Sequence, residues 1–330
     1  MCRRGEARCF SYFVSENEID THPNHLVMKS YLYCAVLAVV LASCIDTESR
    51  LPEEERANVL IEEQLLQNSQ KMIEAAKTKS FAKISSLYDK EAMLMAEYNP
   101  LITTRDNIKV YYEEIFGRED VKTYTRALID TLVFEDRVIE IGLFTKVLDS
   151  SDVYRGKYFN VWKRDSAQHL TLLAEAFGYL HQVEAPSPLV VHSVAKTEVE
   201  AITIPWELEA YNALNETNVI DRIPEKSANA YSVDAMYLPF ADTIQSGRSV
   251  LVQHYQDYYR HPAKIDSIQV IPFAVDTVDD GYIRYAGFYV DWSVPGFSGS
   301  TAGTGISYWR REEDRSLRIH RQIGLHIHRE

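Results

Sequence analysis

The sequence predicts an α+β fold that is present twice, in two consecutive domains. A strand-like segment, Gly156–Asp165 (GKYFNVWKRD), returns in altered form as Gly303–Glu312 (GTGISYWRRE). Upstream, Tyr88–Phe116 aligns without a gap with Tyr231–Tyr259. In both copies helix-like patterns come before a run of long strand-like segments, which is the order typical of α+β domains. The chain is therefore an internal duplication.

The first copy begins with helices. From about Glu54, apolar residues recur at the spacing of one helical face, which predicts a helix that faces the core. Ser80 is placed to cap a short second helix over 81–88, and Arg105–Phe116 is predicted to be a third. Strand-like runs with alternating side chains supply the sheet, at 92–98, 122–134, 138–148, 153–164 and 169–181.

The second copy repeats this order of elements. Pro205 and Pro224 stand where its first two helices are expected to begin, because the missing N–H of proline costs nothing in a first turn. A strand over 234–240, a helix over 248–259 and four further strands follow. The largest divergence between the copies is Ser293–Thr304, which is rich in Gly, Ser and Pro and is expected to be a loop where specificity varies.

Composition limits the functions that the chain can have. A length of 330 residues suits two domains. The net charge of -13 argues against a nucleic-acid partner, because phosphate binding needs a basic face. The four cysteines are Cys2, Cys9, Cys34 and Cys44, so the rest of the chain has neither a disulfide framework nor a thiol nucleophile.

The N-terminal part carries a targeting signal. Met28–Cys44, MKSYLYCAVLAVVLASC, has a basic start, an apolar run too short to span a bilayer, and small residues before its last cysteine. Leu41–Cys44 resembles the lipobox of bacterial lipoproteins, in which the cysteine is acylated. We therefore expect a misassigned upstream start at 1–27, a signal peptide at 28–43, lipidation of Cys44 and an acidic tether at 44–55. This address is the bacterial cell envelope, with an outer-membrane anchor and a periplasmic or surface face.

The order of elements resembles that of the SnoaL-like and ketosteroid-isomerase-like domains of the nuclear transport factor 2-like superfamily. The motifs that carry the resemblance are an arginine-containing third helix and the later pattern G-x-Y-x-x-x-W-x-R. The resemblance implies a cone-shaped fold, with N-terminal helices on a curved antiparallel sheet. It covers a first domain at 56–183 and a second at 197–330, joined by a linker at 184–196. The superfamily includes enzymes, ligand-binding modules and assembly domains, so the fold does not choose among them.

Arg321 is the leading candidate for a ligand-binding residue. Alternation along Leu317–Ile327 places it in a row of aliphatic side chains on one face of the last strand. A buried guanidinium needs an anionic or hydrogen-bonding partner, which can be the carboxylate of a ligand. The alternative is a structural ion pair with Asp291 or Asp257. The aligned residue in the first copy is Ala174, so this site is confined to the second domain.

Other residues are expected to outline pockets between helices and sheet. In the second domain they are Tyr255 and Tyr237, Ser307, Trp309 and Asp291; in the first domain the candidate is Asn160. Enzymes of the superfamily use an aspartate and a tyrosine in this pocket, but neither copy has a pattern that transfers, so no catalytic residue is assigned. His320, His326 and His328 share the opposite face of the last strand but lack a placed acidic or cysteine ligand, and neither a metal nor a cofactor is predicted.

Three functions stay open at this point. The preferred prediction is an envelope lipoprotein that binds a small molecule in a pocket between sheet and helices. The alternatives are an enzyme of the SnoaL or isomerase type acting on a small apolar substrate, and an assembly module. The strands carry apolar side chains on both faces, so we also expect the two sheets to pack face to face within one chain.

Overall fold

The structure is a computed structural model that describes residues 53–194, 197 and 200–328. The predicted start, signal peptide and lipidated Cys44 lie outside these residues. Asn58–Glu330 forms one compact unit. Among the described residues, no helix is both long enough and apolar enough to cross a membrane.

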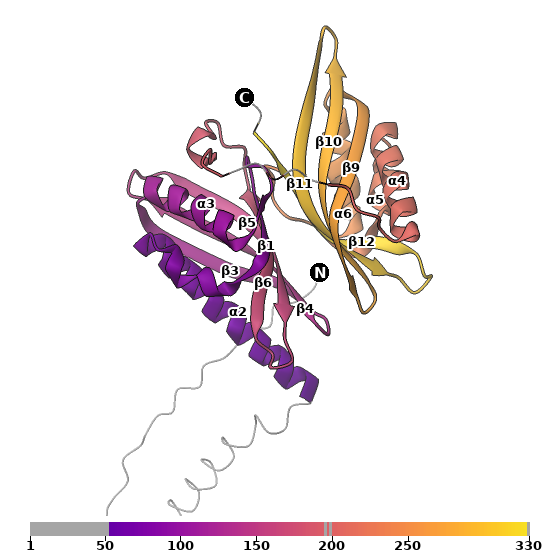
Figure 1. The fold of residues 1–330 in the computed structure, drawn as a ribbon. Helices are drawn as coiled ribbons and strands as arrows, with labels where there is room; N and C mark the ends of the chain where they lie inside the picture. The colour runs from indigo at the N-terminus through magenta and orange to yellow at the C-terminus, as the bar shows by residue number, and fades with distance from the viewer. Residues whose placement is uncertain (1–52, 195–196, 198–199, 329–330) are drawn as a thin grey trace, which may run out of the picture. The chain divides into compact units, whose positions relative to one another are not determined.

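The first domain consists of helices that pack on a six-stranded sheet (Figure 1). Its helical elements are α2 (Glu53–Thr78), the 3-10 turns η2 (Phe81–Lys83) and η3 (Ser85–Leu87), and α3 (Arg105–Arg118). Its strands are β1 (Tyr88–Ala96), β2 (Ile102–Thr103), β3 (Val121–Val133), β4 (Arg137–Leu148), β5 (Val153–Arg164) and β6 (Leu170–Tyr179). The strand order is β2-β1-β6-β5-β4-β3. The sheet is mixed, because β1 and β6 are parallel while the other neighbours are antiparallel as predicted.

Two local predictions in this domain differ from the structure. The short helix expected over 81–88 is a pair of 3-10 turns, and the side chain of Ser80 makes no capping hydrogen bond. Helix α3 does have a side-chain cap: Thr104 accepts a hydrogen bond from the backbone N–H of Asn107. Helix α3 then buries one side against the sheet through Ile108, Tyr111, Ile115 and Phe116.

The second domain repeats this architecture. After the short turn η4 (Ser187–Leu189), its helices are α4 (Trp206–Asp221), α5 (Pro224–Asn229) and α6 (Arg248–Arg260). Its strands are β7 (Tyr231–Leu238), β8 (Gln245–Ser246), β9 (Lys264–Val278), β10 (Gly281–Val294), β11 (Phe297–Arg311) and β12 (Leu317–His326). The order β8-β7-β12-β11-β10-β9 matches that of the first sheet strand for strand. The duplication and the α+β fold class are confirmed.

The segment Ser293–Thr304 is not the loop that its composition suggested. Strands β10 and β11 continue through it as a long hairpin with paired residues up to Val294 and Phe297, and Figure 1 shows this hairpin extending beyond the neighbouring strands. The turn itself is short and contains Gly296 at a φ of +83°, a conformation that glycine adopts without strain.

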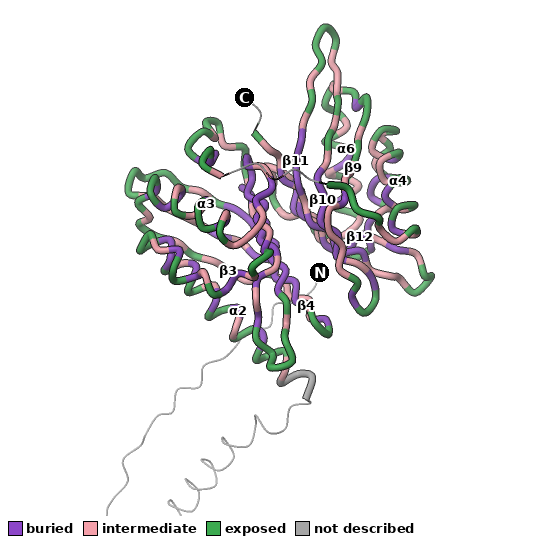
Figure 2. Tube along the Cα trace, in the orientation of Figure 1, coloured by how far each residue is buried: buried purple, intermediate pink, exposed green. Residues whose placement is uncertain are grey.

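Buried residues run along the strands of both sheets (Figure 2). The helix-facing side of the first sheet contains Trp162, and that of the second contains Trp309; both indoles are almost fully buried. The other faces contribute to one hydrophobic cluster that includes Ile139 and Phe159 of the first sheet and Ile306 of the second. Apolar side chains on both faces of the strands are thus accounted for by burial.

Candidate functional site

A row of polar side chains crosses the helix-facing side of the first sheet. Glu140 on β4, Asn160 on β5 and Glu175 on β6 are direct cross-strand partners. None of the three is more than 2% exposed. Buried polar groups of this kind have to be paired within the protein, so their partners show how the site is built.

Glu175 is held by two tyrosines. The hydroxyl groups of Tyr88, at the start of β1, and Tyr112, on α3, donate hydrogen bonds of 2.5 and 2.7 Å to its Oε2 atom. Burial raises the pKa of Glu175, and the Arg126 charge and the two tyrosine hydroxyls oppose that shift by stabilising the ionised form. The negative charge of Glu140 raises the pKa further. The result is a buried acid that keeps its proton more readily than an exposed glutamate.

Glu140 organises the other end of the row. Its Oε2 atom accepts hydrogen bonds from Nδ2 of Asn160, at 3.0 Å, and from the indole Nε1 of Trp162, at 2.9 Å. Trp162 is therefore both a core residue and a hydrogen-bond donor. The Oδ1 atom of Asn160 and the hydroxyl of Thr131, the next residue of the row on β3, are buried without a hydrogen-bond partner.

Arg126, on β3, is positioned beside the row by two aromatic residues. Its Cζ atom lies 3.9 Å from the ring centroid of Tyr158, and its Nη1 atom donates a hydrogen bond of 3.2 Å to the hydroxyl of Tyr124. Its Nε and Nη2 atoms are buried and have no hydrogen-bond partner. Among the described residues no ion pair joins Arg126 to a carboxylate, so these two N–H groups are the least satisfied donors of the site.

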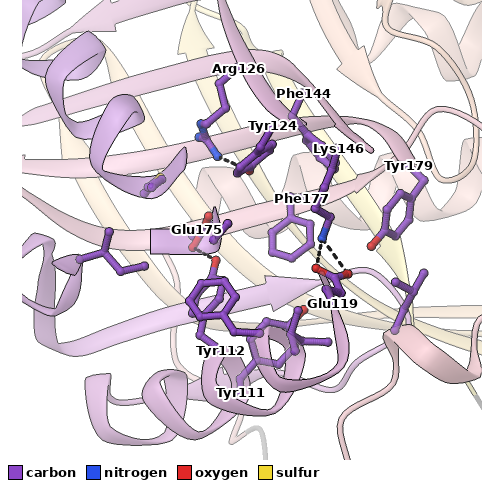
Figure 3. Close-up of a pocket in the computed structure, with 16 residues that line it drawn as sticks. Tyr111, Tyr112, Glu119, Tyr124, Arg126, Phe144, Lys146, Glu175, Phe177 and Tyr179 are labelled. Atoms are coloured by element: carbon purple, nitrogen blue, oxygen red, sulfur yellow. Dashed lines mark hydrogen bonds and ion pairs between the residues drawn. The ribbon is translucent and has the colours of Figure 1, made fainter. Parts of the chain in front are cut away.

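Arg126 and Glu175 line the same cavity, which has a volume of about 50 Å³ (Figure 3). Figure 3 shows both side chains toward one end, with Lys146 and Glu119 at another part of the wall. The Lys146 ammonium and the Glu119 carboxylate form an ion pair of 2.6 Å. The rest of the lining is largely apolar and aromatic. It comes from α2, α3, the sheet, η4 and the residue between η2 and η3: Met72, Ala76, Ile84, Tyr111, Tyr112, Ile115, Phe116, Tyr124, Phe144, Phe177, Tyr179 and Leu189.

The second domain has a corresponding row with different chemistry. Arg284 on β10, Ser307 on β11 and Gln322 on β12 are cross-strand partners. Tyr231, the counterpart of Tyr88, donates a hydrogen bond of 2.7 Å to the Oε1 atom of Gln322. The hydroxyl of Tyr255 lies 3.0 Å from that of Tyr231. The tyrosine pair is retained, while an amide stands where the first domain has the acid.

The structure brings together most of the residues that the sequence suggested for the second domain. Tyr255 and Ser307 belong to the region around Gln322, and the ring of Tyr237 lies 5.8 Å from that of Tyr231. The indole of Trp309 donates a hydrogen bond of 2.8 Å to the hydroxyl of Ser307. Trp309 also lines a second cavity of about 80 Å³, together with residues of α4 and α5.

Arg321 and Asp291 lie apart from that group. Arg321 is 8% exposed, and its Nε atom pairs at 2.6 Å with Oδ2 of Asp130, on β3 of the first domain. Asp291 is exposed and accepts a hydrogen bond of 2.8 Å from the hydroxyl of Ser267. The expectation that Asp291 would be the partner of Arg321 is therefore wrong.

A bulge in β12 explains the misplaced arginine. Ile319 pairs with Trp309 and Arg321 with Tyr308, so His320 is an extra residue in the ladder. Before the bulge, Ile319 faces the helix-side cluster; after it, Ile323 belongs to the cluster on the other face. The single aliphatic row expected from strict alternation does not exist.

The sequence singled out Asn160 as a pocket residue; the structure places it in the buried polar row but not in the cavity wall. Sequence reasoning missed Glu175, Glu140 and Arg126. The test that singled out Arg321, a charged residue within an apolar strand, applies equally to Glu175, which stands between Leu172 and Phe177. The hydrogen-bond partners of Glu175 come from separate elements, so no short sequence motif contains them.

Comparisons with known proteins concern the fold. No protein-family model and no curated protein matches the sequence. A ketosteroid isomerase-like protein from Erwinia carotovora atroseptica is 14% identical, and the match covers 38% of this chain and 96% of that one, with a TM-score of 0.34. A nuclear transport factor 2-like superfamily protein from Salmonella enterica serovar Typhimurium is 11% identical over 38% and 91% of the two chains, with a TM-score of 0.34. An NTF2-like protein with a cystatin-like fold from Novosphingobium aromaticivorans is 16% identical over 37% and 80%, with a TM-score of 0.32.

The two halves of the chain have the architecture that the sequence resemblance implied. Each has helices on one side of a six-stranded sheet, and the strand order is the same in both. The chain contains two tandem copies of one α+β fold, each with helices packed on a mixed six-stranded sheet.

Proposed function

We propose that the first domain binds a small organic molecule in the cavity between α2, α3 and the sheet. The observation that carries this proposal is the cavity's combination of aromatic walls with two buried ionisable groups, Glu175 and Arg126. A concave, largely apolar site with a few fixed polar groups is the usual form of a small-molecule site. At about 50 Å³ the cavity is well below the roughly 300–1,000 Å³ of sites for drug-sized ligands, so the ligand is small.

A matched pair of substitutions tests this proposal. Ala76 is buried in the cavity wall, whereas Ala82 is exposed a few residues later. A panel of neutral, anionic and cationic small molecules is screened by ligand-observed NMR against the wild type, Ala76→Phe and Ala82→Phe. We expect binding that Ala76→Phe blocks and Ala82→Phe leaves intact. Binding that is equal in all three proteins, or absent from the wild type, would contradict the proposal.

A second candidate function is catalysis of the isomerase type on a small apolar substrate. It is favoured by one observation: burial raises the pKa of Glu175, and two tyrosine hydroxyl groups adjoin its carboxyl group. An acid whose pKa approaches the working pH can transfer protons in both directions. In D₂O, the wild type would then exchange the α-hydrogens of cyclopentanone faster than Glu175→Gln. Equal rates in the two proteins would remove this candidate.

We further propose that the chain works at a membrane of the bacterial envelope, anchored through a lipid on Cys44. The support is the lipobox-like Leu41–Cys44 after a short apolar run. Acyl chains provide the membrane affinity of such proteins, so Cys44→Ala is expected to leave the detergent phase in a phase-partition experiment or to accumulate unprocessed. Unaltered partitioning would contradict the anchor.

The packing of the two sheets within one chain is also a proposal, and it bears on the alternative of an assembly module. It is supported by the shared hydrophobic cluster and by two ion pairs, Arg321 with Asp130 and Arg137 with Asp276, each of which joins a residue of one sheet to a residue of the other. If the second domain covers this face of the first, the face is not free for another protein.

A further inference from the structure

We propose that the first-domain cavity binds a short-chain carboxylate, whose two oxygens are held by the Nε and Nη2 groups of Arg126. The inference rests on the proposed function, because it names the ligand class of the same site. It goes beyond the proposed function in specifying the charge of the ligand and the residue that recognises it.

The orientation of the guanidinium carries the inference. One face of Arg126 lies on the ring of Tyr158, and its Nη1 atom is bonded to Tyr124. The remaining edge, Nε and Nη2, is the one that pairs side-on with both oxygens of a carboxylate. Both atoms are buried without a partner, and Arg126 lines the cavity. Because buried donors without partners are costly, an acceptor in the cavity would gain from both of them.

The walls define the rest of the ligand. Beyond Arg126, the cavity is bounded mainly by aliphatic and aromatic side chains, including Phe144, Phe177 and Phe116. An apolar chain can be buried against these residues, whereas a second charged group would meet only Lys146 and Glu119, which already pair with each other. The small volume limits that chain to a few carbon atoms. A short aliphatic acid such as butyrate combines the required head and tail.

Charge balance predicts that the ligand enters together with a proton. The ionisable groups that face Glu175 are Tyr88 on β1, Tyr111 and Tyr112 on α3, Arg126 on β3 and Glu140 on β4. Arg126 is the one cation among them, and an anion bound to its free edge would offset the charge that favours ionised Glu175. The pKa of Glu175, already raised by burial, would rise further when the anion binds. At any pH at which Glu175 is ionised in the free protein, it would therefore take up a proton on binding.

The second domain provides an internal comparison. Arg126 pairs with Phe144 on β4, which pairs in turn with Gly156 on β5. The equivalent series in the second domain is Val270, Phe288 and Gly303. Val270 thus stands where the first domain has the arginine, and Gln322 stands where it has Glu175. We therefore expect one carboxylate site per chain rather than two.

Calorimetric titration of the full chain in nonionic detergent tests the inference, with butyrate as the probe and butyramide as its neutral isostere. The variants are Arg126→Gln, Arg126→Lys, Glu175→Gln and, as a matched control, Arg155→Gln, which alters an exposed arginine of β5. We expect one butyrate per wild-type chain and at least tenfold weaker binding for Arg126→Gln. Arg126→Lys should lose an intermediate amount of affinity, because an ammonium lacks the paired donors of the guanidinium. Arg155→Gln should bind butyrate with wild-type affinity. Butyramide binding to each variant verifies that the cavity is intact.

The uptake of a proton on butyrate binding is measured by repeating the titrations in two buffers of different ionisation enthalpy, between pH 6 and 9. Wild-type affinity for butyrate should fall as pH rises through the pKa of free Glu175, by up to about tenfold per pH unit, and proton uptake should disappear in Glu175→Gln. If butyramide binds but butyrate does not, the carboxylate inference is overturned while the proposed function stands. If neither binds and no other small molecule occupies the cavity, both are overturned. Butyrate affinity that is the same in Arg126→Gln as in the wild type would also overturn the inference.

Discussion

The two copies share a framework and differ in charge at its centre. In both, a tryptophan near the end of the third long strand is buried, and a tyrosine at the start of the first strand bonds to a residue of the last one. In the first copy the central row is Glu140, Asn160 and Glu175. In the second it is Arg284, Ser307 and Gln322, listed here in the same strand order. The acid has become an amide, and the other carboxylate has become a cation.

The two copies share the hydrogen-bonded framework and differ in the ionisable groups that it holds. The tyrosine hydroxyl can donate to a carboxylate or to an amide oxygen, so a hydrogen bond is present in both copies. The ionisable behaviour does not survive, because glutamine has no proton to exchange. Burial also lowers the pKa of Arg284 to about 10, which is the opposite electrostatic problem from that of Glu175. The anion site proposed for the first copy does not rest on this row but on Arg126, which has Val270 as its counterpart in the second copy.

The largest expected effect concerns the shared scaffold. Trp162→Ala and Trp309→Ala each remove a large side chain that is 1% exposed, and each should lower the free energy of unfolding by about 3–5 kcal/mol. Denaturant unfolding followed by circular dichroism measures both. A loss below about 1 kcal/mol in one copy alone would show that the two scaffolds are not equivalent.

The next effect concerns Arg321, whose counterpart in the first copy is Ala174. Removing one member of a buried ion pair costs about 3–5 kcal/mol, but the Asp130 side chain is 23% exposed, so we expect Arg321→Ala to cost about 2 kcal/mol. A double-mutant cycle with Asp130→Ala measures the coupling of the two residues. Strictly additive losses would contradict the ion pair and with it the proposed packing of the sheets.

How much of this could be predicted depends on the range of the interactions. The duplication and the fold class follow from local patterns and were predicted correctly. The position of Arg321 was not, because a single bulge at His320 moves every later residue of β12 to the other face. The Glu175 site escaped prediction for another reason: its partners come from β1, α3 and β3, and only folding brings these elements together.

A smaller effect should distinguish the copies by pH. Burial raises the pKa of Glu175 from 4.5, so its ionisation opposes folding. The wild type and Glu175→Gln should differ by a constant amount below about pH 4, where the acid is protonated in both states. As pH rises through the folded-state pKa, the wild type should lose stability relative to the variant, by about 1.4 kcal/mol for each unit of pKa shift. Unfolding titrations from pH 4 to 8 measure this loss, and a pH-independent difference would contradict the raised pKa.

The reverse exchange sharpens the same comparison. Gln322→Glu puts an acid into the second copy, two strands away from the cation Arg284 rather than from the carboxylate Glu140. Its pH-dependent loss of stability should therefore be smaller than that caused by Glu175. An equal or larger loss would show that the charge two strands away does not set the acidity of this position.

The smallest effect is expected at Asp291. This residue is exposed and bonds to Ser267 at the surface, so Asp291→Ala should alter the free energy of unfolding by less than about 0.5 kcal/mol. Thermal unfolding provides the measurement. A loss above about 1 kcal/mol would mean that Asp291 has a role beyond this surface contact.

The most direct test of the central claim is a crystal structure of the protein grown with butyrate. The account predicts one butyrate per chain, in the cavity of the first domain, with its carboxylate oxygens within hydrogen-bond distance of Nε and Nη2 of Arg126 and its chain toward Phe177. Butyrate beside Arg284 or Gln322 in the second domain, or a first-domain cavity that excludes it at saturating concentration, would contradict the account.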